Sequence, residues 1–565
     1  MRRAGALLVV GAGSLALALL LPRPTAAAWP TDPLVNVPLC TATGDQAAPI
    51  SVPDGSGGAI VAWHDYRGDL YAQRVSAGGA LQWAVGGVAL CTAAGDQTNP
   101  GITPDGAGGA IVCWQDGRTS GVATDLYAQR ISAGGTVQWT ADGVALCTAT
   151  GMQSYPAIAP DGAGGAIVTW SDFRGGATSD LYAQRISADG LVQWAADGVA
   201  LCAATGNQTH PGIVPDGAGG AIVAWQDSRS GNSDLYAQRI SAGGAARWAT
   251  DGVALCTATG DQWLPTIAPD GAGGAIVTWT DYRSGNRDVY AQRISAGGAA
   301  QWTTDGVALC TATGDQDLPR VAPDGAGGAI VTWQDPRGSG FFDLYAQRIS
   351  AGGGVQWTTD GVALCTATGD QTSPAITSDG AGGAIAAWPD SRSGGYDLYA
   401  QRISNDGTVR WSIDGVALSS ASGDQWTPTI TPDGAGGALV AWQDYRNGNG
   451  DIYAQRVKWN GALGGDAPTA VQGGTPLAFA LEPVHPNPAR GGVLTVRFAL
   501  GSAAPASLEL LDVAGRRIAA RSVGSLGAGR HEQALGEGRH LAPGLYLVRL
   551  RQGTDTRVTR VAVLK

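Results

Sequence analysis

Short apolar runs alternate with turn signals along most of the chain and recur with a fixed period. The clearest run reads GGAIVTW and ends at an aspartate, and a second run, DLYAQRIS, follows after a polar loop. A Pro-Asp-Gly turn (Ser-Asp-Gly in the seventh copy) precedes each of eight copies, with its aspartate at Asp54, Asp105, Asp161, Asp216, Asp270, Asp324, Asp379 and Asp433. The steps between these aspartates are 51, 56, 55, 54, 54, 55 and 54 residues. A period of this length indicates stacked supersecondary units.

Each unit contains four strand-sized segments separated by turn signals. In the copy that ends at Asp281, a short first strand surrounds Ile267, and a second strand places Val277, Trp279 and Asp281 on one face. A loop leads to a third strand of the DLYAQRIS type, and an Ala-Gly-Gly turn leads to a fourth of the form QWxxDGVALC. No segment keeps a helical period, so the sequence predicts an all-β protein.

Four strands in each of eight units favour an eight-bladed β-propeller over a linear β-solenoid, whose coils are usually shorter. The chain ends offer a further argument. A lone fourth strand at Val37–Cys40 precedes the first unit, and the last unit lacks its own fourth strand. Pairing the two would complete the last blade and remove an open sheet edge. We therefore predict an eight-bladed propeller over residues 29–463, closed by the N-terminal strand.

The remaining segments predict an exported protein with a second domain. Residues 1–28 have two arginines, an apolar run and a small-residue end, which is typical of a signal peptide; a retained membrane anchor is the alternative. Residues 464–476 are rich in Gly, Pro and Ala and indicate a linker. Residues 477–565 alternate in a different pattern that predicts an Ig-like β-sandwich.

The formal net charge is −11, but it is unevenly distributed. From residue 466 onward there are 12 Arg and Lys against 7 Asp and Glu, or +5, whereas the rest has 24 against 40, or −16. An acidic repeat region argues against nucleic acid as a partner, because phosphate binding requires basic stripes.

The cysteines follow the repeat and predict free thiols. Seven occupy one repeat position, at Cys40, Cys91, Cys147, Cys202, Cys256, Cys310 and Cys365, where the eighth copy has Ser419. Equivalent points on separate units are too far apart for a disulfide, which needs Cα atoms within about 7 Å. Cys113 lies on a different strand and has no evident partner in the sequence.

Two parts of the sequence resemble known families. The turns Ser187-Ala188-Asp189-Gly190 and Ser404-Asn405-Asp406-Gly407, each followed by a tryptophan, resemble degenerate Asp boxes of sialidase-type propellers, although the glycine spacing differs and most copies replace the Asp with Gly. In those propellers the box is structural. This resemblance therefore implies the fold and does not imply an enzyme.

About the last 85 residues resemble the C-terminal sorting domain of type IX secretion cargo and the related FlgD-type Ig-like domain. The matching residues are Pro486-Asn487-Pro488, Leu511-Asp512-Val513-Ala514-Gly515-Arg516, Pro543-Gly544-Leu545-Tyr546 and the end from Thr559 to Lys565. This resemblance implies export machinery as a partner and a secreted or outer cell-surface location. A plain accessory sandwich is the alternative.

Catalytic motifs are scarce in the predicted mature chain. None of its five histidines lies in an HExxH pattern, and no GxSxG elbow occurs there. The Trp-x-Asp aspartates and the YAQR arginines recur in every blade, so we interpret them as an intra-blade Asp–Arg or strand-capping network, represented by Asp227, Arg239, Asp281 and Arg293. We predict no catalytic residue, metal site or cofactor, with loop-bound calcium as the alternative.

Comparison of the copies locates the variation in two sets of loops. The loops between the second and third strands and the two positions after Gly-Asp-Gln differ between copies, whereas the other turns barely change. In a propeller these variable loops share one face, which is the expected place for recognition. The aromatic and imidazole candidates for binding there are Tyr66, Tyr155, Phe173, His210, Trp263, Tyr282, Phe341, Phe342, Tyr396, Trp426 and Tyr445.

These patterns predict an exported or cell-surface, non-enzymatic propeller that binds a glycan, a protein or a surface polymer. A sialidase-like or lyase-like glycan-processing enzyme and a structural envelope protein are the alternatives. Neutral drift of exposed loops would also explain the variable face.

Overall fold

The computed structural model describes residues 28–66, 69–119, 123–338, 340–464, 480–481, 484, 489–490, 494–500, 506–523, 529–535, 541–552 and 555–564. These residues form strands and turns, with no helix among them and so none that could span a membrane. The chain divides into two compact units, Met1–Pro468 and Thr469–Lys565. Residues 1–27 of the predicted signal peptide and 465–476 of the predicted linker lie outside the described residues.

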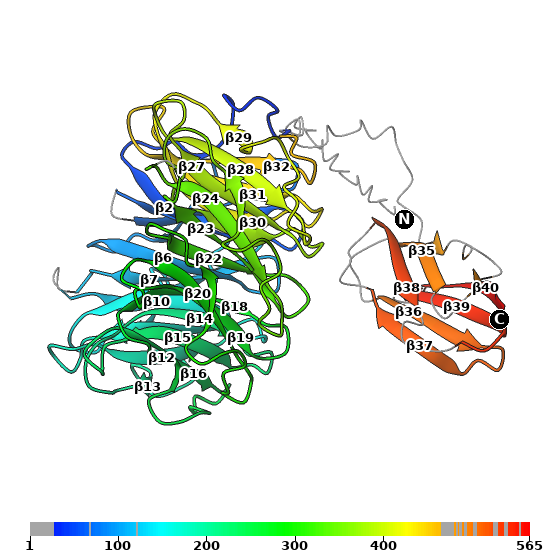
Figure 1. Ribbon diagram of the computed structural model, residues 1–565, viewed down its shortest axis with the longest axis horizontal. Helices are drawn as coiled ribbons and strands as arrows, with labels where there is room; N and C mark the ends of the chain where they lie inside the picture. Colours follow the sequence, from blue (N-terminus) through cyan, green and yellow to red (C-terminus); the bar gives the residue numbers. More distant parts are fainter. Residues whose placement is uncertain are drawn as a thin grey trace, which may run out of the picture. The chain divides into compact units, whose positions relative to one another are not determined.

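The first unit consists of eight four-stranded antiparallel sheets, called blades 1 to 8 in chain order (Figure 1). Blade 1 is β2 (Gln46–Pro53), β3 (Ala59–Asp65), β4 (Asp69–Val75) and β5 (Val88–Cys91). Blade 2 is β6 (Gln97–Pro104), β7 (Ala110–Asp116), β8 (Asp125–Ile131) and β9 (Val144–Cys147). Blade 3 is β10 (Gln153–Pro160), β11 (Ala166–Asp172), β12 (Asp180–Ile186) and β13 (Val199–Cys202). Blade 4 is β14 (Gln208–Pro215), β15 (Ala221–Asp227), β16 (Asp234–Ile240) and β17 (Val253–Cys256).

The second half of the unit repeats this order. Blade 5 is β18 (Gln262–Pro269), β19 (Ala275–Asp281), β20 (Asp288–Ile294) and β21 (Val307–Cys310). Blade 6 is β22 (Asp317–Pro323), β23 (Ala329–Asp335), β24 (Asp343–Ile349) and β25 (Val362–Cys365). Blade 7 is β26 (Ala375–Ser378), β27 (Ala384–Asp390), β28 (Asp397–Ile403) and β29 (Val416–Ser419). Blade 8 combines β30 (Gln425–Pro432), β31 (Ala438–Asp444) and β32 (Asp451–Val457) with the N-terminal strand β1 (Val37–Cys40).

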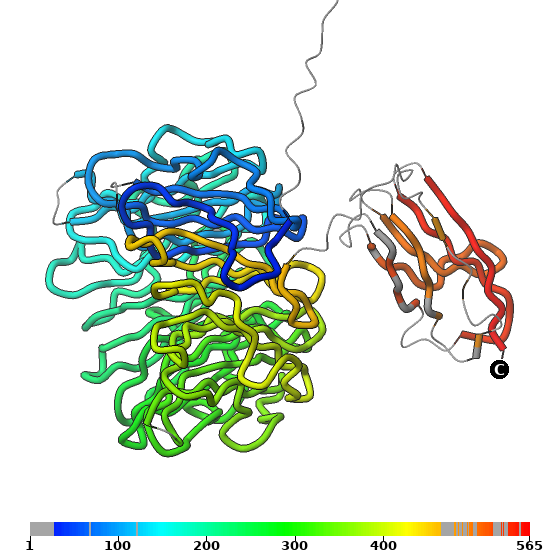
Figure 2. The backbone as a smooth tube through the Cα atoms, turned by 90° about the horizontal axis from the view of Figure 1, so that it is seen from above, coloured from blue at the N-terminus to red at the C-terminus, as the bar shows by residue number. Residues whose placement is uncertain are grey.

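The pairing of β1 with β32 joins the two ends of the repeat region. The strands are antiparallel, with Val37 opposite Ala454 and Cys40 opposite Ile452. Figure 2 shows the blue N-terminal segment beside the gold segment that contains β32. The first strand of each blade also contacts the first strand of the next blade, and β30 contacts β2. The all-β prediction and the predicted position of this fourth strand are confirmed, and the blades have a propeller-like arrangement.

Two predicted strand lengths are wrong. The first strand of blade 5 is eight residues long and includes a register shift, whereas the sequence suggested a short strand. The fourth strand covers only the Val-Ala-Leu-Cys segment, here Val307–Cys310. It starts late because Asp305 and Gly306 both adopt left-handed backbone conformations, at φ values of 59° and 90°. The residues from Trp302 to Asp305 form a bend and a turn, so the strand begins only at Val307.

Large side chains are buried between blades. The tryptophan of every second strand is fully buried: Trp63, Trp114, Trp170, Trp225, Trp279, Trp333, Trp388 and Trp442. Each hydrophobic cluster around such a tryptophan draws on two neighbouring blades; Leu235 of β16 and Trp279 of β19, for example, share one cluster. The second strands are buried on both faces, which explains why their apolar runs are almost continuous.

The second unit contains two sheets around its own core. One sheet has the order β33 (Ala480–Leu481), β35 (Leu494–Leu500) and β38 (Gly529–Leu535). The other has the order β34 (Ala489–Arg490), β40 (Asp555–Leu564), β39 (Gly544–Gln552), β36 (Ala506–Asp512) and β37 (Arg517–Ser522). The buried core includes Val496, Phe498, Leu508, Leu510 and Val548.

Candidate ligand-binding site

The two variable sets of loops lie on the same side of the blades. Asn232, between the second and third strands of blade 4, donates from Nδ2 to the carbonyl oxygen of Gly260, in the turn before the first strand of blade 5, at 2.7 Å. The neighbouring amide of Ser233 donates to Oδ1 of Asp261 at 2.8 Å. We call the surface formed by these two sets of loops the loop face. The uniform turns form the opposite side, which we call the template face.

A ring of eight residues on the loop face adopts an uncommon backbone conformation. Each is the second residue after the Gln that follows the fourth strand, and each has a φ value between 46° and 53°. The ring residues, which we call the entrance ring, are Ala48, Asn99, Tyr155, His210, Leu264, Leu318, Ser373 and Thr427. None is glycine, although left-handed conformations cost other residues about 1–3 kcal/mol each.

A repeated bulge imposes this conformation. In blade 4 the pairing of β14 with β15 shifts register between Thr209 and Gly212, which leaves His210 and Pro211 outside the ladder. A proline follows every ring residue, and proline has no amide hydrogen to donate to a ladder. Bulges of this kind redirect a side chain. Because the backbone conformation is common to all eight blades, the side chain alone distinguishes one ring position from the next.

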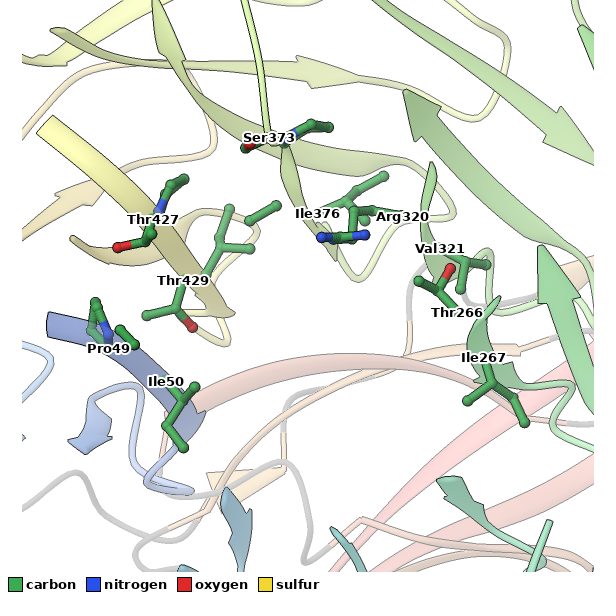
Figure 3. Close-up of a pocket in the computed structure, with 15 residues that line it drawn as sticks. Pro49, Ile50, Thr266, Ile267, Arg320, Val321, Ser373, Ile376, Thr427 and Thr429 are labelled. Atoms are coloured by element: carbon green, nitrogen blue, oxygen red, sulfur yellow. The ribbon is translucent and has the colours of Figure 1, made fainter. Parts of the chain in front are cut away.

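The entrance ring opens onto two adjoining cavities. Their volumes are about 540 and about 460 Å³, and both are lined by Ala48, Ile50, Thr266 and Arg320. The larger cavity also reaches Ser373 and Thr427, and the smaller one reaches the other ring residues. Figure 3 shows Thr266 of β18, Arg320 of β22 and both Thr427 and Thr429 of β30 around the larger cavity. Volumes of this size suit a small ligand or part of a polymer.

Six of the predicted binding residues form three aromatic or imidazole pairs. Tyr155 lies 4.4 Å from His210 between ring centroids, Trp263 lies 4.9 Å from Tyr282, and Tyr396 lies 4.0 Å from Trp426. Tyr155 and His210 are the two of the predicted residues that line a cavity. Burial lowers the pKa of His210, so its imidazole is neutral near pH 7.

The other predicted residues are spread over the loop face, outside the lining of these cavities. Tyr66 is 64% exposed and lies beside His64, and Phe341 is 50% exposed. Phe173 is half-buried. The backbone amide of Phe342 donates to Asp370 Oδ1 at 3.0 Å, and the Tyr445 hydroxyl accepts a hydrogen bond from Gln443 at 2.8 Å.

A series of hydrogen bonds connects one aromatic pair to the smaller cavity, which Leu318 lines. The Tyr282 hydroxyl accepts a hydrogen bond from Arg287 Nε at 2.6 Å, and Arg287 Nη1 forms an ion pair with Asp317 Oδ2 at 2.7 Å. The other carboxylate oxygen of Asp317 accepts hydrogen bonds from the Thr280 hydroxyl at 3.0 Å and from the Leu318 amide at 2.8 Å. Both oxygens of Asp317 are therefore occupied.

Sequence reasoning missed Arg320. At its position the other blades carry small or neutral residues: Ile50, Gly101, Ala157, Gly212, Thr266, Ala375 and Thr429. Arg320 is thus the single cationic residue among the eight equivalent positions, and it lines both cavities. The variable pair after Gly-Asp-Gln is Asp317-Leu318 in this copy. Extending the comparison of the copies by two residues would have identified Arg320.

The predicted Asp–Arg residues belong to two separate networks. Asp281 accepts hydrogen bonds from Trp279 Nε1 at 2.7 Å and from Arg283, whose guanidinium also lies over the ring of Tyr290; Asp227 pairs with Arg229 in the same way. Arg293 pairs with Asp270 instead, and Arg239 pairs with Asp216. The sequence had grouped the two sets into one network.

The second network links blades on the template face. Oδ1 of Asp216 accepts the backbone amides of Ala218 and Gly220, while its other oxygen accepts Arg239 Nε at 2.9 Å. Burial alone would raise the pKa of Asp216, but these hydrogen bonds outweigh it and hold the pKa below its usual value. Arg239 also donates to the carbonyl oxygen of Ala296 in blade 5 at 3.0 Å.

No group of three or more His, Cys, Asp or Glu side chains gathers in position to hold a metal ion within the described part of the chain. The eight cysteines, all of them described, are buried and form no disulfide, as predicted.

Comparison with solved structures finds similarity to glycan-active proteins at low identity. A PL25 ulvan lyase aligns with a TM-score of 0.42 at 11% identity, over 76% of this chain and 97% of that one. An α-L-arabinanase of Penicillium chrysogenum gives 0.34 at 12%, over 54% and 93%. The Hadza microbial sialidase Hz136 gives 0.32 at 12%, over 59% and 73%. At these values the similarity carries no information on what this chain binds. The chain matches none of the curated proteins.

The second unit has a family match. Residues 483–564 match the secretion system C-terminal sorting domain, which confirms the resemblance stated from the sequence. The Leu511–Arg516 motif of that resemblance forms a tight turn, in which Asp512 Oδ1 accepts the amides of Ala514 and Arg516. Pro486–Pro488 lie outside the described residues. A chain that carries this sorting domain is secreted or reaches the outer cell surface.

Proposed function

We propose that the first unit is an eight-bladed β-propeller that binds an extracellular glycan through its loop face, without turnover. The sorting domain, an Ig-like sandwich in this proposal, delivers the propeller to its place of action. The observation that carries the proposal is the entrance ring, in which one strained backbone conformation presents eight positions with differing side chains around two connected cavities.

Ring closure is supported by a repeated hydrogen bond between neighbouring blades. The tryptophan that follows the third strand donates to a backbone carbonyl of the next blade, as in Trp248 to Ala296 at 3.2 Å. Seven such bonds run from blade 1 to blade 8, and Trp29 supplies the eighth by donating to Ala77 of blade 1 at 2.9 Å. The hydroxyls of Ser51 and Thr429 also bond at 2.8 Å between blades 1 and 8.

A glycan suits the chemistry of this face. Tyr155, Trp263 and Trp426 offer aromatic surface for stacking on sugar rings. The hydroxyls of Thr266, Ser373 and Thr427 around the larger cavity can exchange hydrogen bonds with sugar hydroxyls. Cavity walls that combine apolar surface with a few polar groups are typical of small-molecule sites.

Binding without turnover is favoured because no Asp or Glu lines either cavity, among the described residues. Glycoside hydrolysis ordinarily requires two carboxyl groups beside the scissile bond. A lyase-like enzyme is the second candidate, since Tyr155 and a neutral His210 share a cavity with Arg320 and could act as acid or base groups.

Glycan-array binding of the wild-type chain and a Trp263→Ala/Trp426→Ala variant tests the proposal. The matched control is Leu191→Ala/Ile413→Ala, which removes apolar side chains that are 64% and 89% exposed and lie outside the loop face. We expect retained glycans to bind the control normally and the tryptophan variant at least tenfold more weakly. Absence of binding, or equal loss in both variants, would contradict the proposal. Release of shortened or unsaturated products by wild type would favour the second candidate.

A further inference from the structure

Arg320 occupies an unusual environment for an arginine in this protein. In the described residues it forms no ion pair, whereas the arginines of the two repeat networks are paired with aspartate. Its single hydrogen bond runs from Nη1 to the carbonyl oxygen of the adjacent Pro319 at 3.1 Å. A guanidinium has five N–H donors, so most of its donors have no protein acceptor.

The free donors face the cavities. Arg320 lines both cavities, and Figure 3 shows its guanidinium among Ile376, Val321 and Thr266. Each Arg320 nitrogen that makes no hydrogen bond keeps some exposed surface, so the unused donors are open to the cavity. Burial among apolar walls lowers the pKa of Arg320, since the surrounding protein replaces water around its charge.

One carboxylate acts on this charge without forming an ion pair with it. The charge of Asp317 raises the pKa of Arg320, but burial has the larger effect, and the oxygens of Asp317 accept from Arg287, Thr280 and the Leu318 amide. The carbonyl of Pro319 that accepts from Arg320 also accepts from the Thr266 hydroxyl at 3.4 Å. Among the described residues, the cation therefore lies at the cavity wall without an ion-pair partner.

We propose that the two adjoining cavities bind one anionic group, a carboxylate or a sulfate, which Arg320 recognises through its unused N–H donors. Arginine suits this task because its planar fork matches the two oxygens of such a group. The remaining lining is neutral, so the site accepts a single charge flanked by hydroxyl and apolar surface. Such a group is found on a free small anion or on an acidic sugar. The acidic-sugar form rests on the proposed glycan-binding function.

The repeats themselves provide a variant that should fold. Thr266 and Thr429 occupy the position of Arg320 in blades 5 and 8. Arg320→Thr therefore places a residue that this scaffold already accepts there, and Arg320→Lys keeps the charge without the fork. Arg410→Thr is the matched control, since Arg410 is 46% exposed and pairs with Asp406 at 3.5 Å in a template-face turn.

The first experiment uses isothermal titration calorimetry of the full chain with sodium sulfate and sodium acetate, at constant ionic strength set by chloride. We expect saturable binding of at least one of the two anions to wild type and to Arg410→Thr. Arg320→Thr should weaken the affinity for the anion by about tenfold to a hundredfold, the effect of losing a charge-assisted hydrogen-bonded pair. The affinity of Arg320→Lys should lie between those of wild type and Arg320→Thr. Equal binding by wild type and Arg320→Thr, or no binding of either anion, would overturn the proposal.

The second experiment compares trigalacturonate with a neutral galactotriose and separates the two proposals. Preference of wild type for the acidic trisaccharide, lost in Arg320→Thr, supports an acidic sugar as the ligand. Arg320-dependent binding of the inorganic anion with no binding of either trisaccharide supports the anion site and contradicts the acidic-sugar form. Equal binding of both trisaccharides to wild type and to Arg320→Thr overturns recognition of the sugar's charge by Arg320 and leaves glycan binding standing.

Discussion

The indole Nε1 of Trp29 donates a hydrogen bond at 2.9 Å to the carbonyl oxygen of Ala77, 48 residues further along the chain. Trp29 is also 2% exposed and packs in the cluster that contains Leu39, Trp63 and Ile452. The N-terminal segment therefore contributes to both the last and the first blade. A residue that comes before the first repeat thus connects the sheet that contains β1 to blade 1.

Replacing Trp29 tests how much this connection stabilises the first unit. Trp29→Ala should lower the free energy of unfolding by about 3–5 kcal/mol, the usual cost of truncating a buried tryptophan. The control Trp459→Ala removes a side chain that is 59% exposed and should change stability by about 0.5 kcal/mol or less. Thermal or urea denaturation followed by tryptophan fluorescence measures both. Equal, small effects would show that Trp29 does not stabilise the first unit.

The second glycine of each Ser-Ala-Gly-Gly turn is fixed by contact with a tryptophan of the preceding blade. In Gly298 the φ value is +85°, and an added Cβ would lie 2.7 Å from Trp248. Gly298→Ala should therefore cost about 2–4 kcal/mol through backbone strain and overpacking. At the neighbouring Gly297 a Cβ would meet its nearest atom at 3.8 Å, so Gly297→Ala is the control. A comparable loss for both substitutions in a denaturation experiment would contradict this explanation.

Asp343 should make stability depend on pH. Burial, together with the charges of Asp335 and Asp414, raises its pKa to about 6, above the value of about 3.9 expected in the unfolded chain. Between these values the folded state binds more protons than the unfolded state, so stability falls as pH rises from about 4 to about 6 and then levels off. Denaturation midpoints measured across this range would show the fall.

Gly338→Ser should reduce that fall. In blades 4 and 5 the serine at this position donates to the corresponding aspartate at 2.6 Å, Ser230 to Asp234 and Ser284 to Asp288, and a Cβ at Gly338 would meet no atom within 4 Å. The new hydroxyl should lower the pKa of Asp343 by hydrogen bonding to its charged form. Gly297→Ala provides a control far from this aspartate in sequence. An unchanged pH profile in Gly338→Ser would contradict the assignment.

The thiols should be unreactive in the folded protein. Burial raises the pKa of Cys113 and of Cys256 to about 12, and the thiolate is the reactive form. Alkylation with iodoacetamide near pH 8, followed by mass spectrometry, should modify almost none of the eight cysteines in native protein and all eight in denaturant. Fewer than eight in denaturant without reductant would reveal a disulfide.

Removal of residues 483–564 should abolish delivery to the outside of the cell. The expected result is loss of the protein from the medium and the cell surface, with retention inside the envelope of a host that has the matching secretion system. Surface protease accessibility and fractionation measure this. The control is the full-length Trp263→Ala/Trp426→Ala variant, which should be exported normally. Normal export of the truncated chain would contradict a sorting role.

Much of the fold could be read from the repeat. The GGAIVTW and DLYAQRIS runs gave the second and third strands, and the unpaired Val37–Cys40 segment gave the strand that completes blade 8. The short fourth strand was missed although Asp305-Gly306 is a dipeptide typical of turns, and both of its residues adopt left-handed conformations that end any strand before Val307.

The candidate site was predicted only in part. The loop face follows from variation between copies, and two of the predicted binding residues, Tyr155 and His210, line a cavity there. The entrance ring was not foreseen, since its shared feature is a backbone angle and its side chains have nothing in common. Arg320 was passed over because one arginine in a strand usually means an exposed or paired charge.

By itself, the sequence determined the number of blades, their second and third strands, the cysteines that form no disulfide and the sorting domain, because each is written as a local pattern or a count. Tertiary structure alone decided which aspartate each arginine pairs with, since Arg239 meets Asp216 across a hairpin while Asp227 meets Arg229 two residues away. It also decided that Arg320 faces a cavity without a carboxylate partner. Those relationships depend on distances between groups that folding brings together, and spacing along the chain does not encode them.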